Sequence, residues 1–170
     1  MIVLGIDPGP VQSGFAWFRD GVVSEAGVLL NGGLLCLVES EPQDSGAVLA
    51  IETMQASYSA TIGASVIDTL RWVGRYQQAW HSPESVILIT RQAVKAALCN
   101  GNVRANDAGV RAALIDKIGP PGTKGDPGPT YGVTSHAWAA LAVAWATECG
   151  PNVELSGGPG TSGPSARTQG

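Results

Sequence analysis

The sequence predicts an α/β fold with a mixed five-stranded sheet, in which three antiparallel strands are followed by parallel ones and helices flank the sheet. Three strand-like runs lie within residues 2–30, separated by short turns. Two more apolar runs, at residues 47–52 and 85–90, stand on either side of a segment with helical periodicity, as crossover connections to parallel strands require. An Ala-rich segment near the C-terminal end predicts a final helix.

The first strand ends on a carboxylate. The apolar run VLGI leads into Asp7, and Pro8 and Gly9 then favour a turn. Asp7 is therefore expected at a strand end, where a metal ligand can be presented. The alternative is a carboxylate that only caps the turn through the neighbouring backbone.

The next two strands are expected at residues 13–18 and 21–30. Both runs are rich in apolar residues, and Arg19 and Asp20 supply the short connection between them. The spacing predicts an antiparallel meander.

A second acid closes the fourth strand. The run AVLAIE, residues 47–52, ends on Glu52, and the residues that follow have no strong strand preference. If this strand neighbours the first, the carboxylates of Asp7 and Glu52 lie close together. Such a pair is unfavourable unless a divalent cation or a proton neutralises it.

The middle of the chain predicts a helix, a strand and two more helices, at residues 61–80, 85–90, 92–98 and 107–118. The last helix is expected within residues 131–146. Ser135 is the expected N-cap of that helix, and His136 falls in its first turn. A capping or surface histidine is the alternative to a ligand at this position.

These pieces, in this order, resemble the RuvC-like family of Holliday junction resolvases, in the RNase H-like nuclease superfamily, over about residues 1–148. The likeness rests on GIDPG in the first strand, on the strand that ends in Ile51 and Glu52, and on the final helix with His136. The stretch PGPTYGVTSHAWAALAVA is similar to the phage-encoded branch of the family. Three antiparallel strands with helical crossovers to parallel strands is also the RNase H-like topology.

The resemblance implies a crossover junction endodeoxyribonuclease that hydrolyses phosphodiester bonds in branched DNA. Asp7, Glu52 and His136 would be its catalytic residues and its ligands for Mg²⁺ or Mn²⁺. Two ions would bridge the scissile phosphate, with Asp7 between them, Glu52 on one, and His136 on a metal or orienting the water. Because a junction has two-fold symmetry, the family also implies a homodimer.

One position departs from the family pattern. The last helix usually offers a second ligand three residues after the first, on the same helix face, and here that position is Ala139. Three protein ligands and water could still hold Mg²⁺. Asp68 and Asp107 are the nearest substitute acids, but both stand in helical stretches beside arginine and are expected to be solvated surface acids.

Length and composition indicate one domain, residues 1–150, and a Gly-, Pro- and Ser-rich tail, residues 151–170, that is expected to be disordered. The 170 residues, 44% hydrophobic and 14% charged, fit a globular protein. The absence of a long apolar run and of a basic leader predicts a cytoplasmic protein without a membrane partner, in the host cytoplasm if it is phage-encoded. The three widely spaced cysteines support neither disulfides nor a zinc site and are expected to be buried thiols.

The net charge of −4 counts against DNA binding, but its distribution does not. Residues 71–124 include eight basic side chains and three acidic ones. Because phosphate binding depends on a local patch, this segment is expected to contact DNA, with ordinary solvated helix faces as the alternative. The basic residues are Arg71, Arg75, Arg91, Lys95, Arg104, Arg111, Lys117 and Lys124.

Two other functions compete with the nuclease. A non-catalytic junction-binding protein with a degenerate metal site is possible because Ala139 removes a usual ligand. An actin-like phosphotransferase also opens on a strand with Asp and Gly, but it needs a second phosphate-binding half, for which about 150 residues leave no room.

Overall fold

The predicted mixed sheet is present in the computed structural model, which describes residues 1–54 and 63–150. The tail expected at residues 151–170 lies outside the described residues. The sheet has five strands in the order β3-β2-β1-β4-β5, with β1, β2 and β3 antiparallel and β4 and β5 parallel to β1. The strands are β1 (Ile2–Asp7), β2 (Gln12–Arg19), β3 (Val22–Leu30), β4 (Ala47–Thr53) and β5 (Ile87–Thr90).

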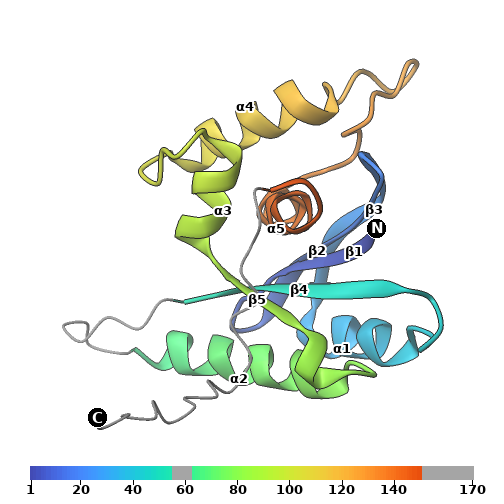
Figure 1. Ribbon diagram of the computed structural model, residues 1–170, viewed down its shortest axis with the longest axis vertical. Coiled ribbons are helices and arrows are strands. Elements are labelled where there is room, and N and C mark those ends of the chain that lie inside the picture. Colours follow the sequence, from blue (N-terminus) through green and yellow to red (C-terminus); the bar gives the residue numbers. More distant parts are fainter. Residues whose placement is uncertain (55–62, 151–170) are drawn as a thin grey trace, which may run out of the picture.

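Helices cover both faces of the sheet. In Figure 1, α1 and α2 lie on one face, whereas α5 lies on the other, with α3 and α4 around it. The helices are α1 (Asn31–Ser40), α2 (Ala64–Ala79), the short 3₁₀-helix η1 (Pro83–Ser85), α3 (Arg91–Leu98), α4 (Asp107–Ile118) and α5 (Ala137–Cys149).

Each face of the sheet has its own hydrophobic core. Because side chains alternate along a strand, Val3 of β1 packs with α3, α4 and α5, while Leu4 and Ile6 pack with α1 and α2. The α5 core residues include Leu141 and Val143, both fully buried. Burial of α5 between the sheet and the outer helices fixes the position of its N-terminal end.

The sequence analysis missed one element and misplaced the start of another. Helix α1 was not expected, because Asn31, Gly32 and Gly33 resemble a turn. Ser135 was predicted as the N-cap of α5, and this was wrong: Ser135 has φ +47°, His136 occupies the cap position, and no side chain caps the helix there.

Two glycines let α5 approach the sheet. A Cβ at Gly5 of β1 would overlap the backbone of Ala140 and Ala144, and a Cβ at Gly14 of β2 would overlap the carbonyl group of His136. The close approach therefore depends on the absence of side chains at these two positions.

In the described part of the chain, no helix is both long and apolar enough to cross a bilayer. The three cysteines are free, and the expectation that they are buried is wrong, because Cys36 and Cys149 are exposed and Cys99 is half-buried.

Candidate active site

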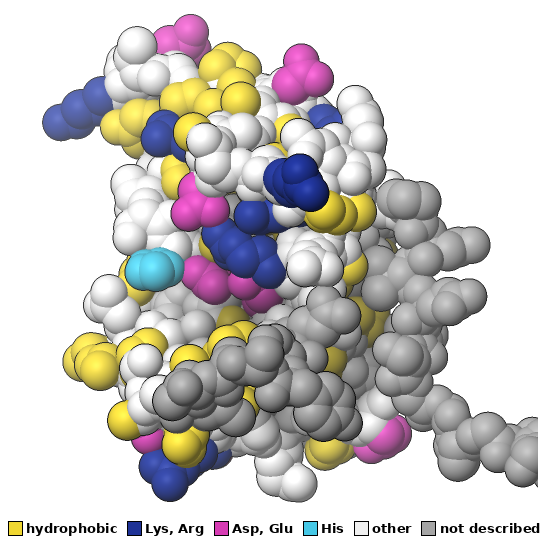
Figure 2. Space-filling model, turned by 90° about the vertical axis from the view of Figure 1, so that its left-hand side faces the viewer, with side chains coloured by type: hydrophobic (Ala, Val, Ile, Leu, Met, Phe, Trp, Pro, Cys, Tyr) yellow, Lys and Arg dark blue, Asp and Glu magenta, His cyan; other side chains and the backbone are white. Residues whose placement is uncertain are grey.

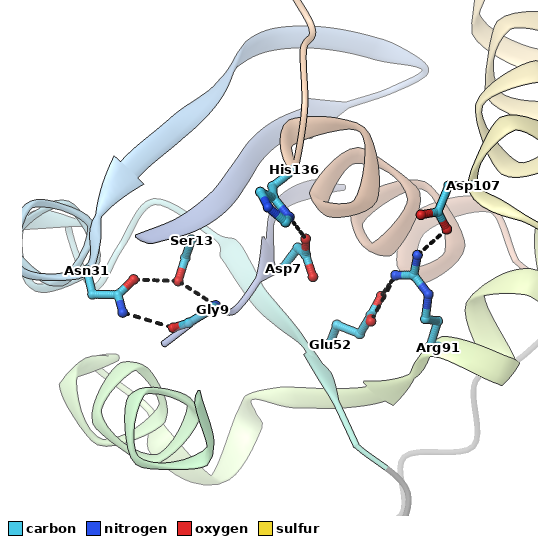
Figure 3. A network of polar contacts seen from close by, with 8 residues as sticks. All are labelled: Asp7, Gly9, Ser13, Asn31, Glu52, Arg91, Asp107 and His136. Carbon is cyan, nitrogen blue, oxygen red and sulfur yellow. Dashed lines mark hydrogen bonds and ion pairs between the residues drawn. The ribbon is translucent and has the colours of Figure 1, made fainter. Parts of the chain in front are cut away.

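Asp7 and Glu52 lie at the same edge of the sheet. Strands β1 and β4 are parallel neighbours, with Ile6 paired to Ile51, so that Asp7 and Glu52 come next on the two strands. Their side chains are only 14% and 13% exposed. Figure 3 shows Glu52 on one side of Asp7 and His136 on the other. The structure thus brings the two acids together as the sequence predicts.

His136 reaches this site from the start of α5. Its Nδ1 lies 3.0 Å from Oδ2 of Asp7, and its side chain is 57% exposed. The register explains the contact: Gly14 is paired with Asp7, and its missing side chain leaves space for the His136 backbone. His136 therefore stands beside Asp7 and is open to solvent.

Burial makes both carboxylates harder to ionise. Desolvation raises the pKa of Asp7, although the His136 hydrogen bond opposes this shift. Desolvation likewise raises the pKa of Glu52; the positive charge of Arg91 opposes it, and the Asp7 carboxylate adds to it. The two acids thus share a site in which an added cation would be stabilised.

Glu52 already has a cationic partner, Arg91. Nη1 of Arg91 donates to both carboxylate oxygens of Glu52, at 3.1 and 3.2 Å, and Nη2 donates to Oδ1 of Asp107. Arg91 opens α3, directly after β5, and Asp107 opens α4, so this chain of ion pairs joins three elements (Figure 3).

A buried polar network holds the turn that follows Asp7. Oγ of Ser13 accepts from the Gly9 N–H at 3.2 Å and donates to Oδ1 of Asn31 at 2.7 Å, while Nδ2 of Asn31 donates to the Gly9 carbonyl at 2.9 Å. The hydroxyl of Tyr76, from α2, lies 3.2 Å from Ser13 Oγ. We call Ser13, Asn31 and Tyr76 the turn clamp. All three are buried, so the clamp fixes the backbone that carries Asp7.

The acids open into a cavity of about 720 Å³. One part of its wall is charged and includes Asp7, Glu52, Arg91, Lys95 and Arg111, while another part, between α2 and α3, is apolar. Figure 2 shows acidic, basic and histidine side chains gathered in the middle of one face, with hydrophobic side chains below them. The apolar lining residues include Met54, Leu70, Val73, Val94 and Trp138.

Ala139 lines the same cavity as His136, so the position that carries a ligand in the family pattern does face the site. Of the two substitute acids, Asp68 pairs with Arg71 on the surface of α2, as expected. Asp107 is 83% exposed but bonds Arg91 within the cavity, so it is more than a solvated surface acid.

The basic segment does not form one patch. Arg91 is engaged by acids, whereas Lys95 and Arg111 line the cavity and the Arg111 guanidinium stacks over the Trp138 ring at 4.7 Å. Arg75 stacks on Trp72 of α2, on the other side of the sheet. Only part of the segment therefore lies near the candidate active site.

No group of three or more His, Cys, Asp or Glu side chains in the described ranges converges as a metal site. Asp7 and His136 form a pair, and the Glu52 oxygens face Arg91. The predicted ligands thus lie in one site, but their side chains do not converge on a single metal position.

The sequence analysis did not identify Arg91 and Asp107 as parts of this site, nor the turn clamp. One signal was available for Arg91, because it directly follows an apolar run, residues 85–90, that is expected to be a strand. The structure pairs this strand with that of Glu52. The Asp107 contact depends on how α3 and α4 pack, which no local pattern reveals.

Comparisons with known proteins show a similarity of fold to solved structures. No protein-family profile and no curated protein matches the chain. Two solved structures are similar: Thermus thermophilus RuvC, with 23% identity and a TM-score of 0.58, and T. thermophilus RuvC in complex with a Holliday junction substrate, with 19% identity and a TM-score of 0.60. Each match covers 85% of this chain, and 91% and 90% of the respective RuvC chains. The chain therefore has the RNase H-like fold of RuvC, while its likeness to the phage branch rests on sequence resemblance alone.

Proposed function

We propose that the chain is a metal-dependent, structure-selective endonuclease that cleaves branched DNA such as Holliday junctions. The observation that carries the proposal is the pair of desolvated carboxylates, Asp7 and Glu52, at adjacent strand ends, with His136 at 3.0 Å from Asp7. The shared fold supports it, since one similar structure is a RuvC complex with a Holliday junction substrate.

The donors suit Mg²⁺ or Mn²⁺, both of which prefer carboxylate oxygens. Asp7 and His136 would hold such an ion, and Glu52 would complete the site through an oxygen lone pair that Arg91 does not use. An ion at this position would activate the attacking water and polarise the scissile phosphate. The turn clamp and α5 would keep the first two donors in place.

The chemistry is hydrolysis at phosphorus. The oxygen of water forms a new P–O bond, the bond between phosphorus and the 3′ oxygen breaks, and a proton ends on that 3′ oxygen. His136 is exposed beside Asp7, where it would either bind the ion or orient the water. Lys95 and Arg111 line the cavity and would bind the DNA backbone.

A homodimer would present two such sites to the two-fold symmetric junction. The assembly belongs to the proposal, as does branched DNA as the partner.

The competing function is a non-catalytic junction-binding protein with a degenerate metal site. Two observations favour it: Ala139 cannot ligate, and Glu52 is bonded to Arg91. Binding would then rest on the basic side chains alone.

Incubation of the full chain with a labelled four-way junction, with Mg²⁺ or Mn²⁺ and with chelator, separates the two functions. We expect nicks that require the ion and that Asp7→Asn abolishes, with junction binding retained. A junction that is bound but stays intact with both ions would support the non-catalytic function. Linear duplex of the same sequence serves as the control for branch selectivity.

A further inference from the structure

Arg91 is paired with two acids and also lines the cavity of the candidate active site. Its guanidinium bonds both oxygens of Glu52 and also Asp107, yet the side chain is 41% exposed and lines the cavity. The guanidinium thus lines the same cavity as Asp7 and His136. Because a guanidinium presents five N–H donors in a plane, it can keep both carboxylates and still face a phosphate.

The donors left for metal ions are few. Asp7 and His136 face each other, Glu52 is engaged by Arg91, and the helix position that faces the cavity one turn after His136 is an alanine, Ala139. In the described residues no three ligating side chains converge. This arrangement provides for one ion beside Asp7 and His136, and lacks the carboxylates that a second ion needs.

The charges of the side chains in the site also indicate one divalent ion. Asp7 and Glu52 contribute two negative charges, Asp107 contributes a third that its 83% exposure screens, and Arg91 contributes one positive charge. The formal charges of these four side chains sum to −2, which one divalent cation balances. Without DNA, a second ion would leave excess positive charge next to the guanidinium, which repels it.

We propose that the site holds a single divalent cation, beside Asp7 and His136, and that Arg91 supplies the second positive charge to the scissile phosphate. This inference rests on the proposed endonuclease function and makes it more specific. Glu52 and Asp107 then act as positioning residues for the guanidinium, and Glu52 contacts both cations.

The number of ions bound by the full chain is measured by calorimetric titration with Mn²⁺ and by the electron paramagnetic resonance of bound Mn²⁺. We expect one Mn²⁺ per chain, with the spectrum of an isolated ion. Two ions per chain, with the spectrum of a coupled pair, would overturn the inference even if the junction is cleaved. Absence of both Mn²⁺ binding and cleavage would instead remove the proposed function.

Variants at Arg91 test its charge. Arg91→Gln should bind the first Mn²⁺ about tenfold more tightly, because a repelling charge is lost, or should admit a second ion. Its cleavage should fall about 100-fold or more, because the phosphate loses a preorganised charge. Arg91→Lys should keep one ion per chain and part of the activity.

Arg19→Gln is the matched control, since Arg19 forms an exposed ion pair with Asp20 on the surface. It should change neither Mn²⁺ binding nor cleavage. An Arg91→Gln protein that binds Mn²⁺ and cleaves as the parent does would contradict the inference. If that variant fails to fold, the ion count of the parent and the behaviour of Arg91→Lys still decide.

Discussion

The two acids of the candidate site are positioned by different physical means. Asp7 is followed by a turn that a buried network of neutral groups holds, through Ser13, Asn31 and Tyr76. Glu52 is held by ion pairs with Arg91, which is 41% exposed and bonds a still more exposed Asp107. One acid is fixed by hydrogen bonds that salt does not weaken, and the other by charges that solvent and ions can reach.

The difference has a functional consequence. The Asp7 side is rigid and local, because the clamp connects β1, β2, α1 and α2 around one turn. On the Glu52 side, the Arg91 guanidinium joins β4, α3 and α4 through ion pairs. We expect changes on the Asp7 side to alter stability and metal binding together, and changes on the Glu52 side to alter charge-dependent properties with little cost in stability.

Gly14→Ala should have the largest effect of the changes around Asp7. The new Cβ would overlap the His136 backbone and push α5 away from the sheet, at a cost of about 1–3 kcal/mol in the free energy of unfolding. Cleavage should fall severely, because His136 moves away from Asp7. Urea unfolding and junction nicking measure both effects.

Gly33→Ala is the matched control for that change. Gly33 lies in α1 with open space around it, so the substitution should leave cleavage unchanged and stabilise the helix by up to about 1 kcal/mol. Equal cleavage by Gly14→Ala and Gly33→Ala would show that the contact between His136 and Asp7 does not matter.

Ser13→Ala breaks the turn clamp at its centre. The substitution removes the partner of Asn31 Oδ1 and of the Gly9 N–H, and it leaves the Tyr76 hydroxyl only a 3.5 Å bond to the Asn31 carbonyl. We expect a loss of about 1–3 kcal/mol in the free energy of unfolding. The loss should be the same at low and high salt. Ser40→Ala, which removes only an exposed bond to Leu37, is the control and should cost much less. A loss for Ser13→Ala that shrinks with salt would argue against a neutral clamp.

Ala139→Asp would add a carboxylate to the cavity wall, on α5 one turn after His136. We expect the Mg²⁺ concentration needed for half-maximal cleavage to fall severalfold, because a further ligand and a negative charge attract the ion. His136→Ala should raise it. Unchanged Mg²⁺ titrations for both variants would exclude this end of α5 from the metal site.

Arg111→Gln should have the smallest effect, confined to DNA affinity. Arg111 lines the cavity and stacks on Trp138, so its loss would remove one of the proposed phosphate contacts. The slope of log affinity against log salt should become about one unit shallower. Arg19→Gln should leave the slope as it is, and an unchanged slope for Arg111→Gln would place the DNA elsewhere.

The sequence was sufficient for the sheet and for the placement of Asp7 and Glu52. Strands such as residues 47–52 are continuous apolar runs, and two acids that end parallel neighbours must lie at one edge. Helix α1 was missed because its first residues favour turns, although Leu34 and Val38 are buried one helical turn apart. Tertiary burial here outweighs a weak local preference.

The rest of the site depends on packing between distant elements. Ser135 has a left-handed conformation, and His136 after it packs against Gly14 of the sheet. Preferences for capping residues do not predict such a tertiary contact. Arg91 and Asp107 meet only because α3 and α4 start side by side. Residue type led to the proposed chemistry, but the partner of each charge was set by the fold.

The central claim is that Asp7 is a desolvated carboxylate that binds a divalent cation. Thermal unfolding tests it, with the parent and Asp7→Asn compared in the presence and absence of Mn²⁺. Burial raises the pKa of Asp7 above its unfolded-state value, so the metal-free protein loses stability as pH rises from the unfolded-state pKa to the folded-state pKa, and the loss is complete above the latter. Asparagine stays neutral and can still accept the His136 hydrogen bond. The variant should therefore melt higher than the parent at neutral pH without metal, and the difference should vanish in acid.

Saturating Mn²⁺ should reverse that order, because the ion binds the folded parent and raises its melting temperature while Asp7→Asn gains little. A parent that melts above Asp7→Asn without metal, or equal stabilisation of both proteins by Mn²⁺, would contradict the account.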